Sequence, residues 1–234
     1  MFLAAFHALS AFAYGYAIRF DYEMTARHEM LLPVQGVYVS KFVWLTMINL
    51  YLQFAYNAYA CILCLVDAMT GGVRRRFLFD RIATVILFPV ALTVVVLFWA
   101  LVILDPNFLM NEDAKRILAI AWFNHTIHTL PVLTVLVDLF GWRHTRSPKL
   151  TAMIHISLFV CLYLAGVHYV YYAHNFWAYP ILGALDAPQR AAFIAACVLF
   201  FFGAFLIGDA LLAVVGAPRI TNLMMAKKSN KKVH

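Results

Sequence analysis

The sequence carries little charge for its length. Of its 234 residues only 12% are Asp, Glu, Lys or Arg, and 65% are hydrophobic. A soluble domain would have about a quarter of its residues charged and about half apolar. This composition excludes water as the main solvent of the chain and indicates a membrane protein.

Cysteines, repeats and linkers are scarce as well. The four cysteines lie in apolar surroundings. The C-x-x-C formed by Cys61 and Cys64 is typical of two buried thiols, with a redox or metal pair as the less favoured alternative. There is no internal repeat or low-complexity linker, and the loops are too short for an independent domain. We therefore predict one transmembrane helical domain over residues 1–216 and a basic cytosolic tail over residues 217–234.

Long apolar runs dominate what is present. A helix needs about 20 apolar residues to cross a bilayer, and such runs occupy roughly residues 2–18, 38–67, 82–104, 117–140, 150–173 and 191–215. They are continuous, whereas the strands of a membrane β-barrel are short and alternate in polarity. The predicted fold class is all-α, a multi-pass transmembrane bundle of about six spans whose helices satisfy their own backbone groups in lipid.

The charges that do occur predict the topology. Two loops and the C-terminal segment hold 12 of the 18 basic residues, so the positive-inside rule places these loops and both termini in the cytosol. The basic residues that give the net charge of +7 are then expected to lie near membrane lipids, and no nucleic-acid partner is expected. Asp138 and Asp209, near cytosolic span ends, are expected to be solvated or paired with loop arginines.

The two ends of the chain bear on targeting. No basic residue precedes the first apolar run, which favours a retained span over a cleaved signal peptide. The chain ends in KKVH, which resembles a dilysine signal for retrieval to the endoplasmic reticulum; the alternative is a basic tail near anionic headgroups. We expect an integral membrane protein of the endoplasmic reticulum or the plasma membrane.

The second apolar run carries a polar stripe. At about 100° per residue, Thr46, Gln53 and Asn57 share one side of a helix, and Asn49 lies about 60° away. Such side chains usually hydrogen-bond between membrane helices, and this structural role is the simpler interpretation of Gln53 and Asn57.

The fourth apolar run contains AWFNHTIHTLPVL over residues 121–133. Asn124 and His128 are one turn apart, and Pro131 cannot donate a hydrogen bond to the carbonyl of Ile127. A kink is therefore predicted beside His128. Counting 1.5 Å per residue from the lumenal ends of both runs places Thr46 and His128 at a similar depth, near the middle of the membrane.

A hydroxyl and an imidazole at one depth can form a catalytic pair. The hydroxyl becomes a good nucleophile when a base such as histidine takes its proton. No carboxylate lies at that depth, so Asn124, His125 or Asn49 would have to orient the ring or stabilise an oxyanion. The alternatives are a purely structural set of polar groups, or a haem or metal held between helices, which is disfavoured because one helix normally gives one axial ligand. No cofactor or metal is expected.

Five segments resemble the androgen-induced protein family, which includes the androgen-dependent TFPI-regulating protein. They are LTMINLYLQ (45–53), FPVALTVVVLFW (88–99), WFNHTIHT (122–129), WAYP (177–180) and LIGD (206–209). They stand in the family's order and near its spacing, so the resemblance spans nearly the whole chain. The combination of N-H-x-x-H-T with T-x-x-[DN]-L-x-x-Q is specific, although neither half alone would be.

The resemblance implies an intramembrane threonine hydrolase. Its substrates are bilayer lipids in which a fatty acid is esterified to the hydroxyl of a hydroxy fatty acid. The family's catalytic threonine and histidine fall on Thr46 and His128. Asn49 stands where some relatives have aspartate, so a carboxylate there is not essential. The stretch from His168 to Trp177 is longer by a few residues, which puts the substrate range in doubt.

Such a substrate has a free carboxylate that prefers a cationic anchor near the interface. Lys41 and Arg116, at the lumenal ends of the second and fourth runs, are the candidates. The competing hypothesis is a non-enzymatic membrane regulator or lipid-binding protein that affects other membrane or secreted proteins, with its polar groups structural.

Overall fold

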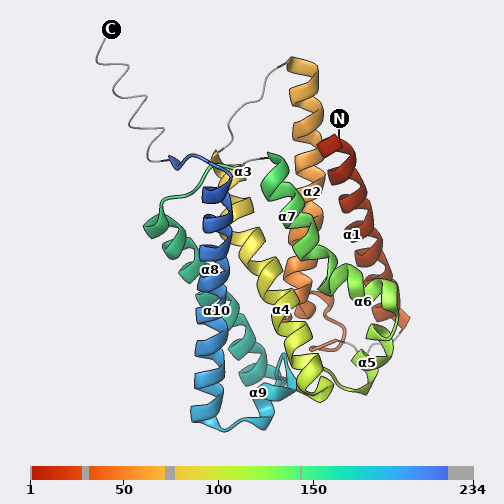
Figure 1. The fold of residues 1–234 in the computed structure, drawn as a ribbon. Coiled ribbons are helices and arrows are strands. Elements are labelled where there is room, and N and C mark those ends of the chain that lie inside the picture. The colour runs from red at the N-terminus through yellow and green to blue at the C-terminus, as the bar shows by residue number, and fades with distance from the viewer. Residues whose placement is uncertain (1, 28–31, 72–76, 143, 221–234) are drawn as a thin grey trace.

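The computed structural model describes residues 2–27, 32–71, 77–142 and 144–220, which form a bundle of helices (Figure 1). Successive long helices alternate in direction, and the first begins at the same end of the bundle at which the last ends (Figure 1). We call this the upper end, as drawn. The long elements are α1 (Phe2–Arg27), α2 (Leu45–Thr70), the continuous helix Phe77–Leu104, α7 (Leu130–Trp142), α8 (Lys149–His174) and α10 (Ala187–Val214). The continuous helix consists of α3 (Phe77–Arg81), η3 (Ile82–Leu87) and α4 (Phe88–Leu104). The shorter ones, η2 (Tyr38–Val43), η4 (Pro106–Phe108), α5 (Glu112–Leu118), α6 (Ala121–His128) and α9 (Pro180–Ala184), lie towards the other end.

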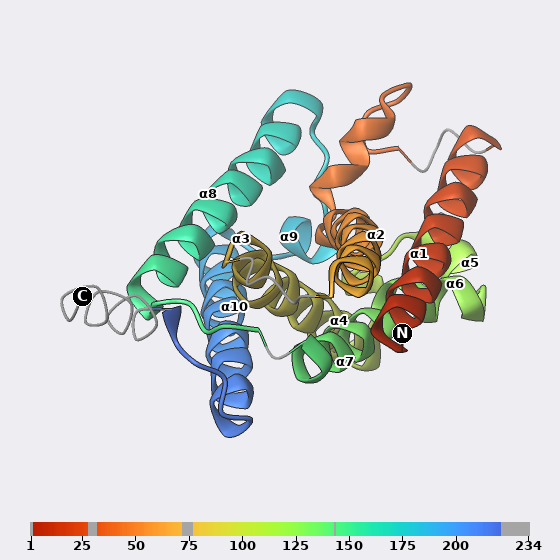
Figure 2. The same ribbon diagram turned by 90° about the horizontal axis from the view of Figure 1, so that it is seen from above.

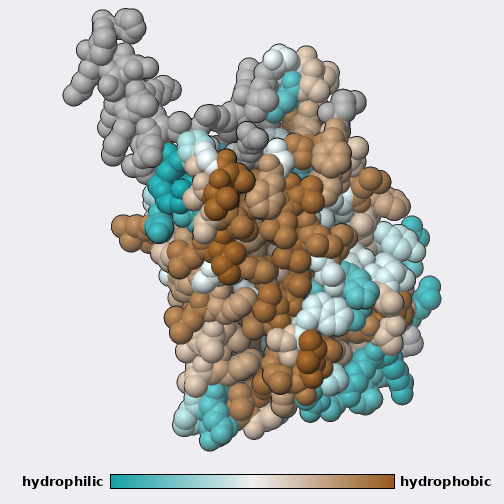
Figure 3. All heavy atoms as spheres, in the orientation of Figure 1, coloured by the Kyte–Doolittle hydropathy of each residue, from teal (hydrophilic) through white to brown (hydrophobic). Residues whose placement is uncertain are grey.

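The all-helical membrane fold is confirmed. Within the described ranges, four helices are long and apolar enough to cross a membrane: α2, the continuous helix Phe77–Leu104, α8 and α10. Hydrophobic residues cover the middle of the face shown in Figure 3, and hydrophilic residues gather towards its lower edge. The count of six spans and the cytosolic position of both termini stay predictions. The KKVH segment lies outside the described residues.

The second span begins later than expected. Residues 38–43 form the separate 3-10 helix η2, and Trp44 is extended with φ −87° and ψ 124°. The α-helix begins at Leu45, not at residue 38, because this turn interrupts an apolar run that hydropathy alone shows as continuous. Thr46 therefore lies in the first turn of α2 and not well inside a span. Because Thr46 is one of the two residues of the predicted catalytic pair, its position determines where the candidate site lies.

The fourth span, predicted as one helix over residues 117–140, is broken twice. Ile120 is extended between α5 and α6, and Thr129, with φ −132° and ψ −50°, separates α6 from α7. The second break follows from Pro131, which has no N–H to continue the helix. The predicted kink beside His128 is confirmed, while the single continuous helix was wrong.

Helix α4 occupies the centre of the bundle and is surrounded by α2, α7, α8 and α10 (Figure 2). The π-helix η3 ends two residues before Pro89. A wide π turn at this point accommodates a residue that cannot donate to the carbonyl four positions earlier. Gly208 lets α10 approach α4 closely, since a Cβ there would lie 2.8 Å from the ring of Phe88. Small residues at such contacts are typical of membrane helix pairs.

Buried charged groups join α1, α2, α3 and α7 at the upper end. His144 Nδ1 lies 2.8 Å from Asp80 Oδ1, and its Nε2 lies 2.8 Å from Asp138 Oδ2. Tyr56 donates to the same Asp138 oxygen at 2.8 Å, and His7 Nε2 lies 3.4 Å from Asp138 Oδ1. We call these five residues the upper-end cluster. Asp138 was expected to be solvated or paired with arginine, which is wrong, because the loop after α7 folds back and buries His144 against it.

Asp209 behaves as expected. It accepts hydrogen bonds from Arg146 and Arg219, at 2.7 and 2.9 Å to Oδ2. Arg219 also donates to the carbonyl of Ser147, and Ile220 is buried. The first residues of the predicted tail therefore pack against the bundle, and the rest of the tail lies outside the described ranges.

The upper-end cluster predicts that stability depends on pH. Burial alone would lower the pKa of His144, but the carboxylates of Asp138 and Asp80 outweigh it and raise the pKa to about 9, from an ordinary value of 6.5. The resulting stabilisation is complete below pH 6.5 and is lost as the pH rises through about 9, with a total of roughly 3 kcal/mol. We expect the thermal unfolding midpoint in detergent to fall over this interval. His144→Gln should flatten the curve, and an unchanged slope in that variant would contradict the assignment.

Candidate functional site

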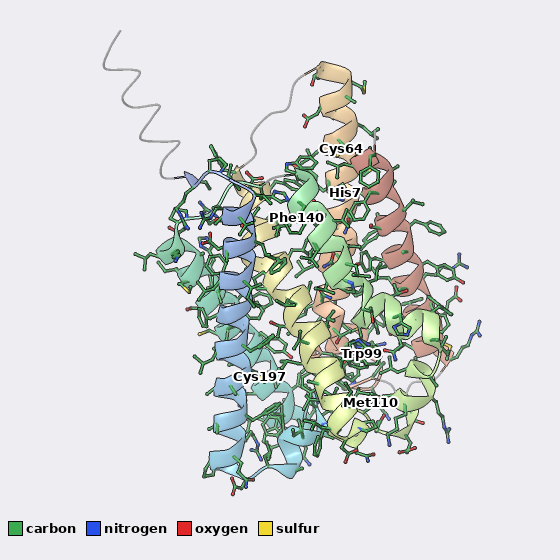
Figure 4. The ribbon with its side chains drawn as sticks, viewed as in Figure 1. His7, Cys64, Trp99, Met110, Phe140 and Cys197 are labelled. Atoms are coloured by element: carbon green, nitrogen blue, oxygen red, sulfur yellow. The ribbon has the colours of Figure 1, made fainter. Side chains whose placement is uncertain are left out.

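The hydroxyl of Thr46 and the imidazole of His128 meet in the lower half of the bundle. Thr46 Oγ1, on the first turn of α2, lies 3.3 Å from His128 Nε2, on the last residue of α6. His128 is buried, with 3% of its surface exposed, while Thr46 is partly exposed. Trp99 and Met110, close to this pair in the fold, are labelled in the lower half of Figure 4, and His7 lies near the upper end. The two residues predicted from the motifs are thus in hydrogen-bonding distance.

Asn124 fixes the orientation of the histidine ring. Its Oδ1 lies 2.8 Å from His128 Nδ1. A carbonyl oxygen can only accept, so Nδ1 carries the proton and donates it. Nε2 is then the unprotonated nitrogen, and it faces the Thr46 hydroxyl. The ring also stacks on Phe98, with centroids 3.4 Å apart and planes 3° from parallel. The arrangement holds a neutral base in one tautomer and one plane.

The break between α6 and α7 helps to hold His128 in place. The helix breaks at Thr129, and the carbonyl of the neighbouring His128 accepts a hydrogen bond from Trp99 Nε1 at 2.8 Å. Trp99 Nε1 also lies 3.2 Å from the hydroxyl of Thr129, the residue at the break. His125 hydrogen-bonds to that hydroxyl at 3.0 Å and stacks on the Trp99 ring. Sequence analysis missed the contributions of Phe98 and Trp99, which lie on a helix with no polar motif.

The start of α2 adds backbone donors beside the hydroxyl of Thr46. The first N–H groups of a helix have no intrahelical partners and carry its positive dipole end. The N–H of Leu45 donates to Tyr179 Oη at 3.0 Å, and those of Met47 and Ile48 donate to the carbonyl of Trp44. The N–H of Thr46 is not used by these bonds. It lies on the same residue as the hydroxyl and is a candidate donor to an oxyanion formed by attack of that hydroxyl.

Two chambers meet at Thr46. The apolar chamber lies between α4, α8, α9 and α10, and the second chamber lies between α2, α5, α6 and the segment before α9. The empty space, with the open surroundings included, is about 1000 Å³ in the apolar chamber and about 980 Å³ in the second chamber. Both are lined by Thr46, Phe98, Leu109 and Tyr179.

The other predicted site residues lie at varying distances from the pair. Asn49 is fully buried, its Oδ1 accepts from Gln53 at 3.5 Å, and it lines neither chamber. Of the two asparagines, Asn124 therefore contacts the pair, while Asn49 stays in the polar stripe of α2. His125 contacts Trp99 and Thr129 and does not contact Thr46 in any described hydrogen bond. Arg116 is exposed and lines neither chamber.

Lys41 lines the second chamber, but it is not a free cation. It is 4% exposed, and its Nζ donates to Asp21 Oδ1 at 2.5 Å and to Thr25 Oγ1 at 2.9 Å. Tyr38 donates to the other oxygen of Asp21 at 2.9 Å. An ammonium group has three N–H donors, so one remains for a ligand.

The other histidines and cysteines of the membrane helices form no further site among the described residues. His155 and His168 hydrogen-bond to carbonyls of their own helix, at 2.6 and 2.8 Å. Cys61 and Cys64 are free and partly buried. Among the described residues, no group of three or more His, Cys, Asp or Glu side chains is placed to hold a metal ion.

Comparison with known proteins identifies relatives of the whole bundle. Residues 2–213 match the model of the FAR-17a/AIG1-like protein family. The chain is 23% identical over 175 residues to human androgen-dependent TFPI-regulating protein, covering 74% of this chain and 76% of that protein. It is 24% identical over 193 residues to human androgen-induced gene 1 protein, covering 77% and 79%. It is 25% identical over 185 residues to a UPF0641 membrane protein of Schizosaccharomyces pombe, covering 77% and 78%. No solved structure gives a significant match.

Proposed function

Because the chain belongs to the FAR-17a/AIG1-like family, we propose that it is an intramembrane hydrolase of fatty acid esters of hydroxy fatty acids. Thr46 is the nucleophile and His128 is the base. The observation that carries the proposal is the 3.3 Å contact from Thr46 Oγ1 to the unprotonated Nε2 of His128, whose other nitrogen is held by Asn124. The site lies in an integral membrane protein, between chambers whose walls are mostly apolar. The endoplasmic reticulum or the plasma membrane remains the proposed location.

Acylation begins with attack by the hydroxyl. Nε2 of His128 takes the proton from Thr46 Oγ1, and the oxygen attacks the ester carbonyl carbon. The negative charge on the former carbonyl oxygen is stabilised by the N–H of Thr46 and the positive end of α2. The carbon–oxygen bond to the hydroxy acid then breaks, and the leaving oxygen takes the proton from His128. The products are an acyl-threonine and a free hydroxy fatty acid.

Deacylation reuses the same groups. A water molecule loses a proton to Nε2 of His128 and attacks the acyl carbonyl. The bond to Thr46 Oγ1 breaks, and this oxygen recovers the proton from His128. A free fatty acid leaves, and no metal or organic cofactor is needed for either step.

An activated fluorophosphonate probe tests the assignment of the nucleophile. The purified protein in detergent should be labelled, and labelling should vanish in Thr46→Ala and fall strongly in His128→Ala. Matched controls are Thr126→Ala, whose hydroxyl bonds to the carbonyl of Trp122, and His168→Ala, whose ring bonds to the carbonyl of Leu164. Both should be labelled like the wild type. Labelling that persists in Thr46→Ala excludes this residue as the nucleophile. Absence of labelling in the wild type favours the competing hypothesis of a non-enzymatic membrane regulator.

The role of Asn124 predicts a graded effect. Asn124→Leu removes the acceptor for His128 Nδ1, so the ring can adopt the other tautomer, with a proton on Nε2 facing Thr46. By analogy with loss of the orienting group in a serine protease, we expect ester hydrolysis to fall by about 10²–10⁴-fold. Asn124→Asp keeps an acceptor and should retain most of the activity. Equal losses in both variants, measured as kcat/KM, would show that the residue acts by packing alone.

A further inference from the structure

The two chambers relate differently to the catalytic pair. Thr46 lines both of them, whereas His128 lines only the second chamber. The second chamber also contains Asp21 and Lys41, while no charged side chain lines the apolar chamber. The base and the charges therefore lie on one side of the nucleophilic oxygen, and an uncharged wall lies on the other.

We infer that the two chambers divide the substrate between them. The fatty acyl chain occupies the apolar chamber, and the hydroxy fatty acid, with its free carboxylate, occupies the second chamber. This inference rests on the proposed hydrolase function and deepens it, because it assigns each half of the ester to named walls of the site.

The position of His128 determines on which side of the acyl carbon the leaving oxygen lies. When the tetrahedral intermediate breaks down, the oxygen of the hydroxy acid leaves and takes the proton from Nε2 of His128. That oxygen must therefore lie on the histidine side of the acyl carbon, which is the side of the second chamber. The acyl carbon stays bonded to Thr46 Oγ1, and its chain extends in the opposite direction, into the apolar chamber.

The free carboxylate of the substrate supports the same division independently. An ionised carboxylate is costly to bury where nothing pairs with it or donates to it. In the second chamber Lys41 has a third N–H donor beyond those used by Asp21 and Thr25. Besides Thr46, the apolar chamber has the polar side chains of Thr93, Tyr163, Tyr179 and Cys197, and none of them is a cation. The hydroxyls of Tyr163 and Tyr179 already bond to the carbonyl of Val43 and the N–H of Leu45. The charged end of the substrate is therefore favoured in the second chamber, which agrees with the position of the base.

This assignment identifies residues that set chain length. Ile194, Cys197 and Val198 of α10 line only the apolar chamber, and Figure 4 shows Cys197 on α10, on a different helix from Trp99 beside the pair. Added bulk there should shorten the space for the acyl chain without touching Thr46 or His128. Ala114 of α5 lines only the second chamber and offers the matched site for the other half.

The test compares Cys197→Trp with Ala114→Trp on three esters. The first is a palmitoyl ester of hydroxystearic acid, the second is the butyryl ester of the same acid, and the third is a palmitoyl ester of a short alcohol. We expect Cys197→Trp to lower kcat/KM for both palmitoyl esters by about tenfold or more and to spare the butyryl ester. Ala114→Trp should lower kcat/KM for both hydroxystearic esters by a similar factor and spare the ester of the short alcohol. Fluorophosphonate labelling and the thermal unfolding midpoint verify that each variant is folded, and Val198→Phe replaces Cys197→Trp if the larger residue prevents folding.

The outcomes separate this inference from the proposed function. In the opposite pattern, Cys197→Trp lowers kcat/KM for the two hydroxystearic esters and Ala114→Trp lowers it for the two palmitoyl esters. That result overturns the proposed division of the substrate between the chambers. Folded, labelled variants that cleave all three esters with unchanged ratios also overturn it, while leaving the hydrolase intact. A wild type that takes up no fluorophosphonate and cleaves none of the esters overturns the proposed function, and the inference falls with it.

Discussion

Replacement of Thr46 by alanine is expected to abolish ester hydrolysis while leaving the fold intact. Thr46 is the only hydroxyl that a described hydrogen bond connects to His128. Loss of the nucleophile in a comparable dyad or triad costs about 10⁴-fold or more in kcat. The residue is partly exposed at a helix start, so its methyl and hydroxyl contribute little to core packing. Release of hydroxy fatty acid by the purified variant, followed by mass spectrometry, measures the effect.

Thr46→Ser separates chemistry from packing. Serine keeps the hydroxyl at the same atom position and loses one methyl group, so we expect activity within about tenfold of the wild type. Activity that disappears in Thr46→Ser, with an unchanged unfolding midpoint, would assign the role of this residue to its methyl group. His128→Gln should lose as much activity as Thr46→Ala, and the double variant should lose no more than either single one, because the two residues act as a unit.

The second large effect concerns stability. Asp138→Ala removes the acceptor shared by Tyr56 and His144 and leaves His144 with one carboxylate, Asp80, and with the hydroxyl of Tyr56 at 3.2 Å from its Nε2. Removing one partner of a buried charged pair typically costs about 3–5 kcal/mol. We expect a large drop in the thermal unfolding midpoint in detergent. The drop should be smaller for Asp138→Asn, which keeps an acceptor oxygen.

An exposed ion pair provides the control for this prediction. Glu23 pairs with Arg19 on the surface of α1 at 2.8 Å. Exposed pairs of this kind contribute little, so Glu23→Gln should leave the midpoint unchanged. Equal effects of Asp138→Ala and Glu23→Gln would show that the upper-end cluster does not hold the helices together.

The proposed catalytic pair could be predicted because its signals are local. The polar stripe of α2 marks Thr46, and N-H-x-x-H-T followed by Pro131 marks His128 and the kink beside it. Asn124, one turn before His128, was named as a candidate to orient the ring, and it is the residue that bonds to Nδ1. Each of these inferences needs only helical periodicity and the chemistry of one side chain.

The rest depends on contacts that periodicity does not encode. Hydropathy does not separate the turn at residues 38–44 from the helix that follows, because Val39, Phe42, Val43 and Trp44 continue the apolar run. The pairing of Lys41 with Asp21 and the burial of His7 beside Asp138 join segments that are far apart in the sequence. Neither contact was predicted from the sequence for that reason. The chambers arise from the packing of α4 against several helices and have no sequence signature.

Direct capture of the covalent intermediate tests the central claim most closely. The protein is mixed with a palmitoyl ester of hydroxystearic acid, denatured in acid during turnover and digested, and the peptides are examined by mass spectrometry. A palmitoyl group on Thr46, absent from Thr46→Ala, is the predicted result. Hydrolysis that proceeds with the palmitoyl group on another side chain, or that continues undiminished in Thr46→Ala, contradicts the account.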